Sequence, residues 1–322
     1  MACQHAPARP RARAARCPGN DQRSPFGPPR GTRLNAALAT LDAFSDRIAS
    51  LDARWIFVAL LFHLGNLSCR TLAWRNILSA AYPAARVRLL DVGAAYAAGV
   101  AANAYLPARG GEALKIALVR LRIPGSNVAG VSASSGVVLL FDAVVGASLL
   151  ATAWALGLVP ALPHPSVPLA LAGGAILIVG ATVVTAVPRL RSNLRQGVAI
   201  LATPGLYLRR VVPYQAGAWA CRLGVTFAML AAFGVPATLP IAGLVVVASG
   251  MSTLVPATPG GAGTQQLLVV VALAHVASAA SALSFSIGMQ VGVTLVNTMI
   301  GMLAMTLVFG TMRPSAIRAL RN

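Results

Sequence analysis

Acidic residues are scarce in this chain. Its 322 residues include seven Asp and Glu residues against 26 Lys and Arg, which gives a formal net charge of +19. Every basic residue except Lys115 is an arginine. Binding to DNA would require these arginines to form a basic face on a soluble fold. They lie instead in the N-terminal region and between apolar runs, where cytoplasmic loops and anionic headgroups attract them, so we expect no nucleic-acid partner.

Motifs for catalysis and metal binding are also missing. The sequence has no GxSxG, HExxH, Walker loop or DxD pattern. Its four cysteines, Cys3, Cys17, Cys69 and Cys221, show no CxxC spacing, which indicates neither a zinc site nor a disulfide framework. We therefore expect no metal, no cofactor and no enzymatic activity.

Apolar residues are abundant. Hydrophobic residues make up 57% of the chain and charged residues 10%, with a mean hydropathy of +0.73. A helix needs roughly 20 apolar residues to cross about 30 Å of hydrocarbon. Candidate spans lie at 54–73, 89–107, 127–158, 168–187, 213–233, 240–256, 264–283 and 285–309. The sequence therefore predicts an all-α, polytopic transmembrane helix bundle of about eight spans.

The chain divides into four predicted segments. Residues 1–33 are rich in Arg and Pro and poor in large aliphatic residues, which predicts a disordered tail. Residues 34–53 place apolar side chains three and four positions apart, which indicates an amphipathic helix on the membrane interface. Residues 54–312 form the transmembrane domain, and 313–322 form a basic cytoplasmic tail.

Arginines in the connections predict the orientation. The segments 109–122 and 189–210 are basic, whereas 159–167 and 234–239 carry no formal charge. Because cytoplasmic loops carry an excess of Lys and Arg, both termini are expected in the cytoplasm, with the protein in the inner or plasma membrane. Four arginines between the first two spans, from Arg70 to Arg88, disagree with this assignment. A re-entrant segment at 89–107, which enters and leaves on one face, is the alternative that would explain them.

Two proline and glycine interruptions suggest an internal repeat with broken or re-entrant helices. The run after Trp74 ends in "LPARGGEALK", and the run after Trp219 ends in "PATPGGAGTQQLL". Proline removes a backbone donor and glycine permits a sharp turn, so free amides at the next helix start would attract anions. Paired breaks mark binding sites in transporters. The alternative is that each break is only a tight loop at the membrane surface.

Three carboxylates follow residue 52, namely Asp91, Glu112 and Asp142. Asp142 lies within "VVLLFDAVVG", where an ionised carboxylate is costly unless it is paired or faces water. It is either the structural partner of an arginine or linked to protons or substrate. Glu112 lies three residues from both Arg109 and Lys115. Arg109 and Lys115 are expected to hold a phosphate, while Glu112 orients Arg109 or contacts a sugar or amine group.

Together these stretches resemble the transmembrane, flippase-like region of the lysylphosphatidylglycerol synthase family, over about residues 54–312. The order Asn-x-x-Leu-Pro-x-Arg-x-Gly-Glu at 103–112 and the Pro-Gly-Gly-x-Gly at 259–263 carry the resemblance, with Trp74-Arg75 and Asp142 in looser agreement. The chain departs at Gln265 and Gln266, where many members have a Glu, and it shows no soluble aminoacyl-transferring domain. The residues expected to bind substrate are Asn103, Pro107, Arg109, Gly111, Glu112, Lys115, Asp142, Pro259, Gly260, Gly261, Gly263 and Gln265.

The resemblance implies membrane lipid handling rather than lipid aminoacylation. We expect a flippase-like translocator whose partner is an anionic or polyprenyl-linked lipid. Two alternatives stay open at this point. One is a non-transporting membrane partner of a glycosyltransferase or aminoacyl-lipid transferase, and the other is a membrane-embedded lipid transferase.

Overall fold

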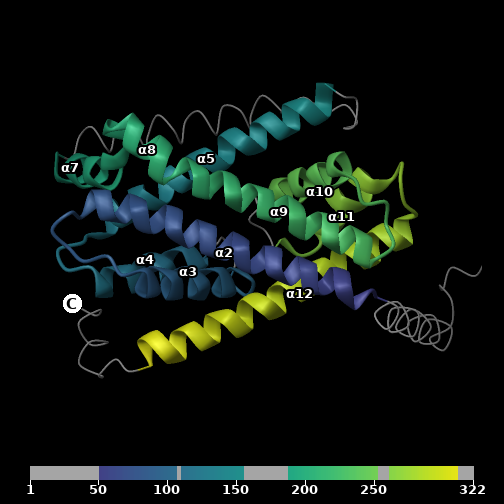
Figure 1. Ribbon diagram of the computed structural model, residues 1–322, viewed down its shortest axis with the longest axis horizontal. Helices are drawn as coiled ribbons and strands as arrows, with labels where there is room; N and C mark the ends of the chain where they lie inside the picture. Colours follow the sequence, from purple (N-terminus) through teal and green to yellow (C-terminus); the bar gives the residue numbers. More distant parts are fainter. Residues whose placement is uncertain (1–50, 107–109, 156–187, 253–260, 311–322) are drawn as a thin grey trace, which may run out of the picture. The chain divides into compact units, whose positions relative to one another are not determined.

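The computed structural model describes residues 51–106, 110–155, 188–252 and 261–310, all within one compact unit, residues 50–322 (Figure 1). In these ranges the regular structure is helical throughout, without a strand, as the sequence predicts. The predicted disordered tail, the span at 168–187, the tail at 313–322 and nearly all of the predicted amphipathic helix fall outside the described residues.

The helices occur in a repeated order of long, short, short and long. The first group is α2 (Ala53–Ala81), α3 (Leu89–Asn103), α4 (Gly110–Arg122) and α5 (Val128–Ala155). The short helices α7 (Pro188–Gly197), η2 (Ala199–Ala202) and α8 (Pro204–Arg210) then lead to the second group. That group is α9 (Val212–Ala232), α10 (Leu239–Ser252), α11 (Thr264–Leu273) and α12 (Ala279–Ala304), which continues into the π-helical turn η4 (Met305–Phe309).

Within the described residues, three helices combine the length and apolarity needed to cross a membrane: α2, α5, and α12 with η4. α9, with 21 residues, is about 31 Å long and reaches across by length. Large apolar side chains cover the outside of the bundle, for example Leu90, Met299 and Leu307, which are 68%, 71% and 69% exposed. A soluble surface seldom presents so many, whereas lipid chains cover them favourably. The described helices thus form a membrane bundle.

The helices α3 and α4 form a short hairpin. With 15 and 13 residues they are about 22 and 20 Å long, less than the roughly 30 Å of the hydrocarbon core. Asp91 at the start of α3 lies 3.6 Å from Arg122 at the end of α4, measured from Oδ1 to Nε. The hairpin therefore begins and ends at one end of the bundle. This favours the re-entrant alternative for 89–107, and the predicted basic loop at 109–122 is in fact mostly helix α4.

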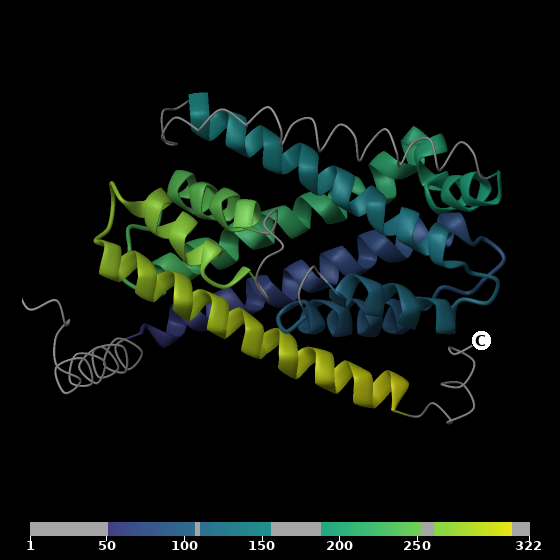
Figure 2. The ribbon, with the colours of Figure 1, turned by 180° about the vertical axis from the view of Figure 1, so that it is seen from behind.

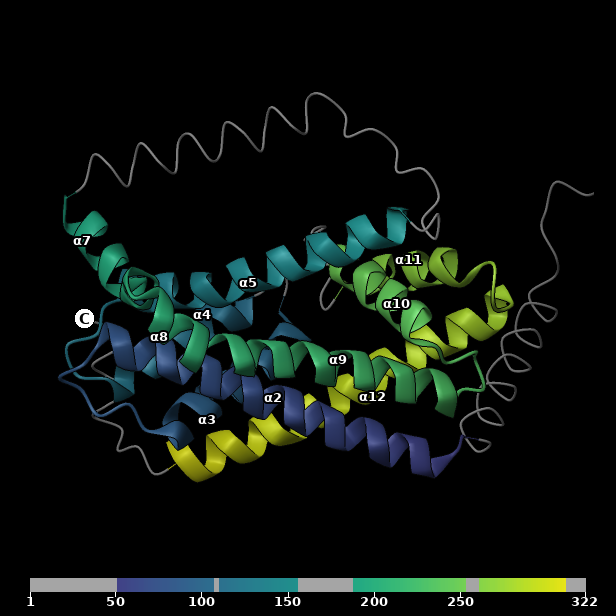
Figure 3. The ribbon, with the colours of Figure 1, turned by 45° about the horizontal axis from the view of Figure 1, so that its top comes forward.

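The helices α10 and α11 form a second short hairpin and lie side by side (Figures 1 and 3). The predicted continuous span at 264–283 is wrong, because α11 ends at Leu273 and α12 begins at Ala279. Between them, the Ser278 hydroxyl accepts a hydrogen bond from the Ser281 N–H (3.2 Å) and caps the new helix.

The two groups of helices are related by a gapless internal repeat. Adding 152 to a residue number carries α2 onto α8 and α9, α3 onto α10, α4 onto α11 and α5 onto α12. Identical residues at this spacing include the pairs Gly65 and Gly217, Cys69 and Cys221, Arg70 and Arg222, Pro107 and Pro259, and Gly111 and Gly263. The repeat is therefore real, but the predicted alignment of Trp74 with Trp219 is wrong, since Trp74 corresponds to Thr226.

The two halves run in opposite directions. α2 and α9 pack along each other (Figures 1 and 2), with Trp55 and Phe227 in contact at 6.1 Å between ring centroids. Toward the other end of α2, Asn76 donates to the carbonyl oxygen of Arg210 at 2.7 Å. The start of α2 thus lies beside the end of α9, which is the antiparallel arrangement of an inverted repeat.

Candidate functional site

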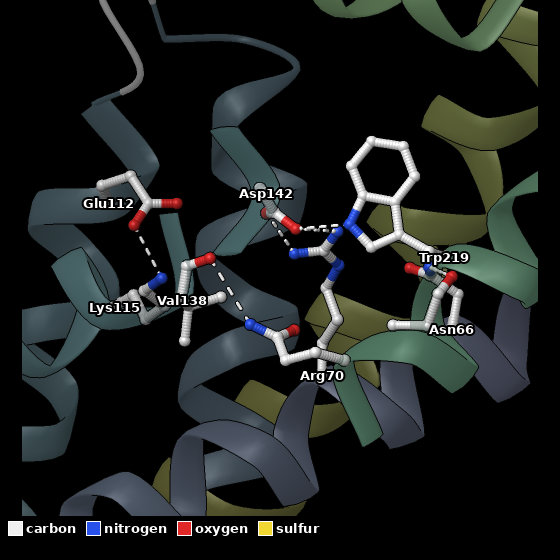
Figure 4. Close-up of polar contacts among 9 residues, drawn as sticks. Asn66, Arg70, Glu112, Lys115, Val138, Asp142 and Trp219 are labelled. Atoms are coloured by element: carbon white, nitrogen blue, oxygen red, sulfur yellow. Dashed lines mark hydrogen bonds and ion pairs between the residues drawn. The ribbon is translucent and has the colours of Figure 1, made fainter. Parts of the chain in front are cut away.

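Asp142, near the middle of α5, is held by side chains from α2 and α9 (Figure 4). The Nη1 and Nη2 atoms of Arg70 lie 2.5 and 3.0 Å from its two carboxylate oxygens. Trp219 donates its indole N–H to Oδ1 at 2.8 Å. The arginine side chain is 9% exposed and that of Asp142 22%. Of the two alternatives for Asp142, pairing with an arginine is therefore observed, and Arg70 is that arginine.

A second ion pair lies on α4. Lys115 Nζ is 2.6 Å from Glu112 Oε2, and the lysine side chain is 8% exposed. Its ammonium group also lies 4.6 Å from the ring centroid of Trp74 and 5.3 Å from that of Tyr96. Aromatic faces attract cations, so one carboxylate and two rings together stabilise this buried charge. Lys115 is thus a residue of the protein interior rather than of an exposed loop.

One face of α2 connects the two ion pairs. Arg70 and Trp74 are four residues apart and lie on the same side of the helix. Trp74 supports Lys115 and donates its indole N–H to the hydroxyl of Ser134 on α5 at 3.0 Å. Figure 4 shows both pairs in one region of the bundle. Two cations and two carboxylates balance in charge, which lowers the cost of placing them at membrane depth.

Two amide side chains extend this polar region along α2 and α9. Asn66 donates to the carbonyl oxygen of Ala218 at 2.6 Å. Gln215 is fully buried and donates to the carbonyl oxygen of Val138 at 3.4 Å. The Oε1 atom of Gln215 has no hydrogen-bond partner in the protein. A buried acceptor of this kind can bind water or a donor group of a substrate.

The first break is closed by Asn103, which ends α3. Its Oδ1 accepts a hydrogen bond from the Gly111 N–H at 2.9 Å, at the start of α4. A Cβ atom on Gly99 would lie 2.8 Å from the Gly111 carbonyl oxygen, so both glycines are needed for the close approach of α3 and α4. Asn103 and Gly111 therefore shape the hairpin. Pro107 and Arg109 lie outside the described residues, and the phosphate contact of Arg109 stays a prediction.

The second break differs from the expectation of free amides. Gly261 and Gly263 have φ values of +73° and +87°, which favour glycine. The Gly263 N–H donates to Oε1 of Gln266 at 2.6 Å, and that side chain in turn donates to Gln290 on α12. The amide of Gly263 is thus already bound within the protein, because Gln266 folds back as a cap.

The remaining residues predicted for the second break are less informative. Gln265 is partly buried, and Pro259 and Gly260 lie outside the described residues. In the described part of the chain, no three His, Cys, Asp or Glu side chains are grouped as metal ligands would be. Of the residues predicted to bind substrate, the structure brings Glu112, Lys115 and Asp142 into ion pairs, Glu112 with Lys115 and Asp142 with Arg70.

Sequence reasoning missed several residues of this cluster. The sequence places Arg70 among four arginines between the first two predicted spans, and it indicates no role for Asn66, Gln215 or Tyr96. The available signals were the four-residue spacing of Arg70 and Trp74 and the recurrence of Gly-x-x-x-Cys-Arg at 65–70 and 217–222. Without a fold, neither signal identifies Asp142 as the partner, since the two residues lie on different helices.

One of three comparisons with known proteins gives a match. Neither the search of curated proteins nor the search of solved structures found a match. The family described as "Lysylphosphatidylglycerol synthase TM region" matches residues 35–301, a range that includes both hairpins and both ion pairs. With this match over most of its length and its apolar helices, the chain is a multi-pass membrane protein that belongs to the lysylphosphatidylglycerol synthase transmembrane-region family.

Proposed function

We propose that the protein moves an anionic or lipid-linked amphiphile between the two leaflets of the membrane. The observation that carries this proposal is the pair of ion pairs, Arg70 with Asp142 and Lys115 with Glu112, within the helix bundle. Ionisable groups at membrane depth are costly and usually mark the path of a substrate or ion. The family match supports a role connected with lipids.

The inverted repeat supports movement of a substrate across the membrane. In transporters of this architecture the binding site lies near the midplane at the repeat interface, and movement of one half exposes it to each side in turn. Asp142 comes from the first half and Trp219 from the second, so their 2.8 Å hydrogen bond crosses that interface. A headgroup phosphate drawn in by Arg109 would compete with Asp142 for the two-point interaction with Arg70.

We also propose that the protein lies in the cell membrane and that the arginine-rich end of its bundle faces the cytoplasm. The arginines of the described part near this end are Arg75, Arg86, Arg88, Arg120, Arg122, Arg189, Arg191, Arg195, Arg209 and Arg210. The opposite end, where α2 begins and α9 ends, has Arg54. Cytoplasmic faces are enriched in Arg and Lys. The sequence predicts that both termini are cytoplasmic. For the N-terminus this depends on residues 1–50 and for the C-terminus on residues 311–322, and both ranges lie outside the described residues.

The test is leaflet exchange in proteoliposomes that contain fluorescent phosphatidylglycerol or a polyprenyl-phosphate lipid. We compare the wild type with Arg109→Ala, Glu112→Gln and Asp142→Asn. Arg120→Gln removes an exposed arginine on the same helix as Glu112 and is the matched control. Exchange should fall by roughly tenfold or more in the first three variants, because each loses a charge-assisted contact, and it should be unchanged in the control.

Other outcomes point to the other functions. If the wild type exchanges neither lipid, translocation is wrong, and a non-transporting partner of a glycosyltransferase or aminoacyl-lipid transferase becomes the better account. Pull-downs from membranes of the native host would then identify that partner. If the purified chain forms a new lipid product, and Glu112→Gln or Asp142→Asn abolishes it, the protein is a membrane-embedded lipid transferase.

A further inference from the structure

A groove of about 420 Å³ lies on the outside of the bundle, between α2, α3 and the final helix α12 with η4. Its walls are mainly apolar and include Leu67, Leu90, Leu303 and Leu307. Leu90 and Leu307 are 68% and 69% exposed, so the groove opens toward lipid. From Ile300 to Val308 the wall formed by α12 and η4 is about 12 Å long.

Two arginines lie where the groove reaches the arginine-rich end. Arg88 directly precedes Leu89 and Leu90, which line the groove. Arg122 donates to the carbonyl oxygen of Val308, another lining residue, and its guanidinium group stacks 4.9 Å from the ring centroid of Phe309. The walls of the groove are thus apolar, and the two arginines adjoin residues that line it.

These two arginines share the carboxylate of Asp91. The closest separations are 4.0 Å for Arg88 and 3.6 Å for Arg122, both longer than a good hydrogen bond. The Arg88 side chain is 62% exposed and that of Arg122 27%, so both arginines have surface that a headgroup can reach. The three side chains carry a net charge of +1, with donor capacity that the carboxylate does not use.

We propose that this groove binds an acyl chain of an anionic phospholipid whose phosphate lies at Arg88 and Arg122. Guanidinium groups bind phosphate oxygens at two points, and basic residues near a cytoplasmic face attract anionic lipids. The apolar walls add shape rather than affinity, since lipid chains in a bilayer are already in apolar surroundings. Selectivity for a charged headgroup over a zwitterionic one therefore comes from the two arginines.

Tyr96 connects the groove with the central ion pairs. It lines the groove, and its ring lies 5.3 Å from the ammonium group of Lys115. A lipid bound here would be next to the translocation site. That supply step rests on the proposed function, whereas binding in the groove does not.

The test is native mass spectrometry of the purified, delipidated full chain, titrated with phosphatidylglycerol and, separately, with phosphatidylcholine. Both headgroups contain a phosphate, but choline adds a positive charge that the net positive charge of Arg88, Arg122 and Asp91 disfavours, so the wild type should retain phosphatidylglycerol at about tenfold lower concentration than phosphatidylcholine. The double variant Arg88→Gln/Arg122→Gln should lose this preference. Arg120→Gln, an exposed arginine at the same end, should keep it. Ser68→Trp places a bulky ring in the groove wall and should weaken binding of both lipids.

The proposal is overturned if the double variant retains phosphatidylglycerol as well as Arg120→Gln does, or if Ser68→Trp binds both lipids like the wild type. Leaflet exchange measured on the same preparations separates the two proposals. Selective binding that depends on Arg88 and Arg122, in a protein that exchanges no lipid, supports the groove and contradicts translocation. If the wild type exchanges lipid between leaflets but shows no preference for phosphatidylglycerol, translocation is supported and the groove proposal is contradicted.

Discussion

Gly65 on α2 lies against Cys221 on α9, and Gly217 on α9 lies against Cys69 on α2. A Cβ atom on Gly65 would be 3.0 Å from the first sulfur, and one on Gly217 would be 3.3 Å from the second. Each glycine thus makes room for the cysteine of the other half. A two-fold relation between inverted repeats produces such reciprocal contacts. They define the register in which α2 and α9 pack against each other.

This register predicts a disulfide that can be formed on purpose. Cys69 lies one helical turn from Gly65, which contacts Cys221, and Cys221 lies one turn from Gly217, which contacts Cys69. The two thiols are therefore neighbours, and mild oxidation should link α2 to α9 within one chain. In a Cys3→Ser/Cys17→Ser background, mass spectrometry of the maleimide-treated protein should show two labelled thiols before oxidation and none after it. A further Cys221→Ser substitution should leave one thiol that stays labelled. Persistent double labelling after oxidation would contradict the register.

The charged cluster does not follow the repeat. At positions 152 residues after Glu112, Lys115 and Asp142 the chain has Thr264, Leu267 and Thr294, whereas Arg70 recurs as Arg222. The halves therefore share their glycine, proline and cysteine framework but not their chemistry. A substrate that meets this protein encounters an asymmetric site, with the ion pairs contributed largely by the first half.

Removing one member of the Arg70 and Asp142 pair should be more harmful than removing both. Arg70→Met leaves a largely buried carboxylate without its cation, which costs about 3–5 kcal/mol of folding free energy in comparable buried pairs. Arg70→Met/Asp142→Leu removes both charges and should recover much of that loss. Thermal unfolding in detergent, followed by size-exclusion chromatography, measures the order of stabilities.

The matched control for this pair is Arg120→Met, which removes an exposed arginine and should leave the midpoint of unfolding close to that of the wild type. If Arg70→Met unfolds at the same temperature as this control, the ion pair contributes nothing to stability. If the double variant is as unstable as Arg70→Met, the loss comes from packing around the arginine rather than from the unpaired carboxylate.

The α3 and α4 hairpin should depend on Gly111. A methyl group there would overlap the Gly99 carbonyl oxygen and crowd Asn103, so Gly111→Ala should separate the two helices. We expect a loss of about 1–3 kcal/mol, as for other overpacked sites. Gly136→Ala on α5 is the control, because a Cβ at that position meets no atom within 4 Å. Equal unfolding midpoints for the two variants would show that the hairpin is not tightly packed.

The sequence was sufficient for the helical membrane class, the family, and the existence of a repeat, because hydropathy and the glycine and proline breaks depend on local composition. It was insufficient for the hairpins. An apolar run such as 89–107 has the composition of a span, and only the contact between Asp91 and Arg122 shows that the chain returns to the same end. Likewise, hydropathy alone did not reveal the cap at Ser278 that divides the run predicted at 264–283.

The site was predicted in part for the same reason. The three-residue spacing of Glu112 and Lys115 is local and, on a helix, allows the ion pair that the structure shows. The partner of Asp142 is 72 positions away and depends on how α2 and α5 pack, so the sequence offered several arginines without a means to choose. The free amides expected after the second break also depended on tertiary detail, since the side chain of Gln266 binds the Gly263 amide.

Orientation gives the last prediction. If the arginine-rich end faces the cytoplasm, a cysteine at exposed Ser192 on α7 should be inaccessible to a membrane-impermeant maleimide in intact cells, and a cysteine at exposed Thr238 before α10 should react. Both substitutions are made in a cysteine-free chain, and both sites should react once the membrane is permeabilised. The opposite pattern would place the arginines outside, and with them the groove at Arg88 and Arg122. Because an anionic cytoplasmic leaflet is the source of the attraction argued for that groove, the same experiment decides which leaflet can supply its lipid.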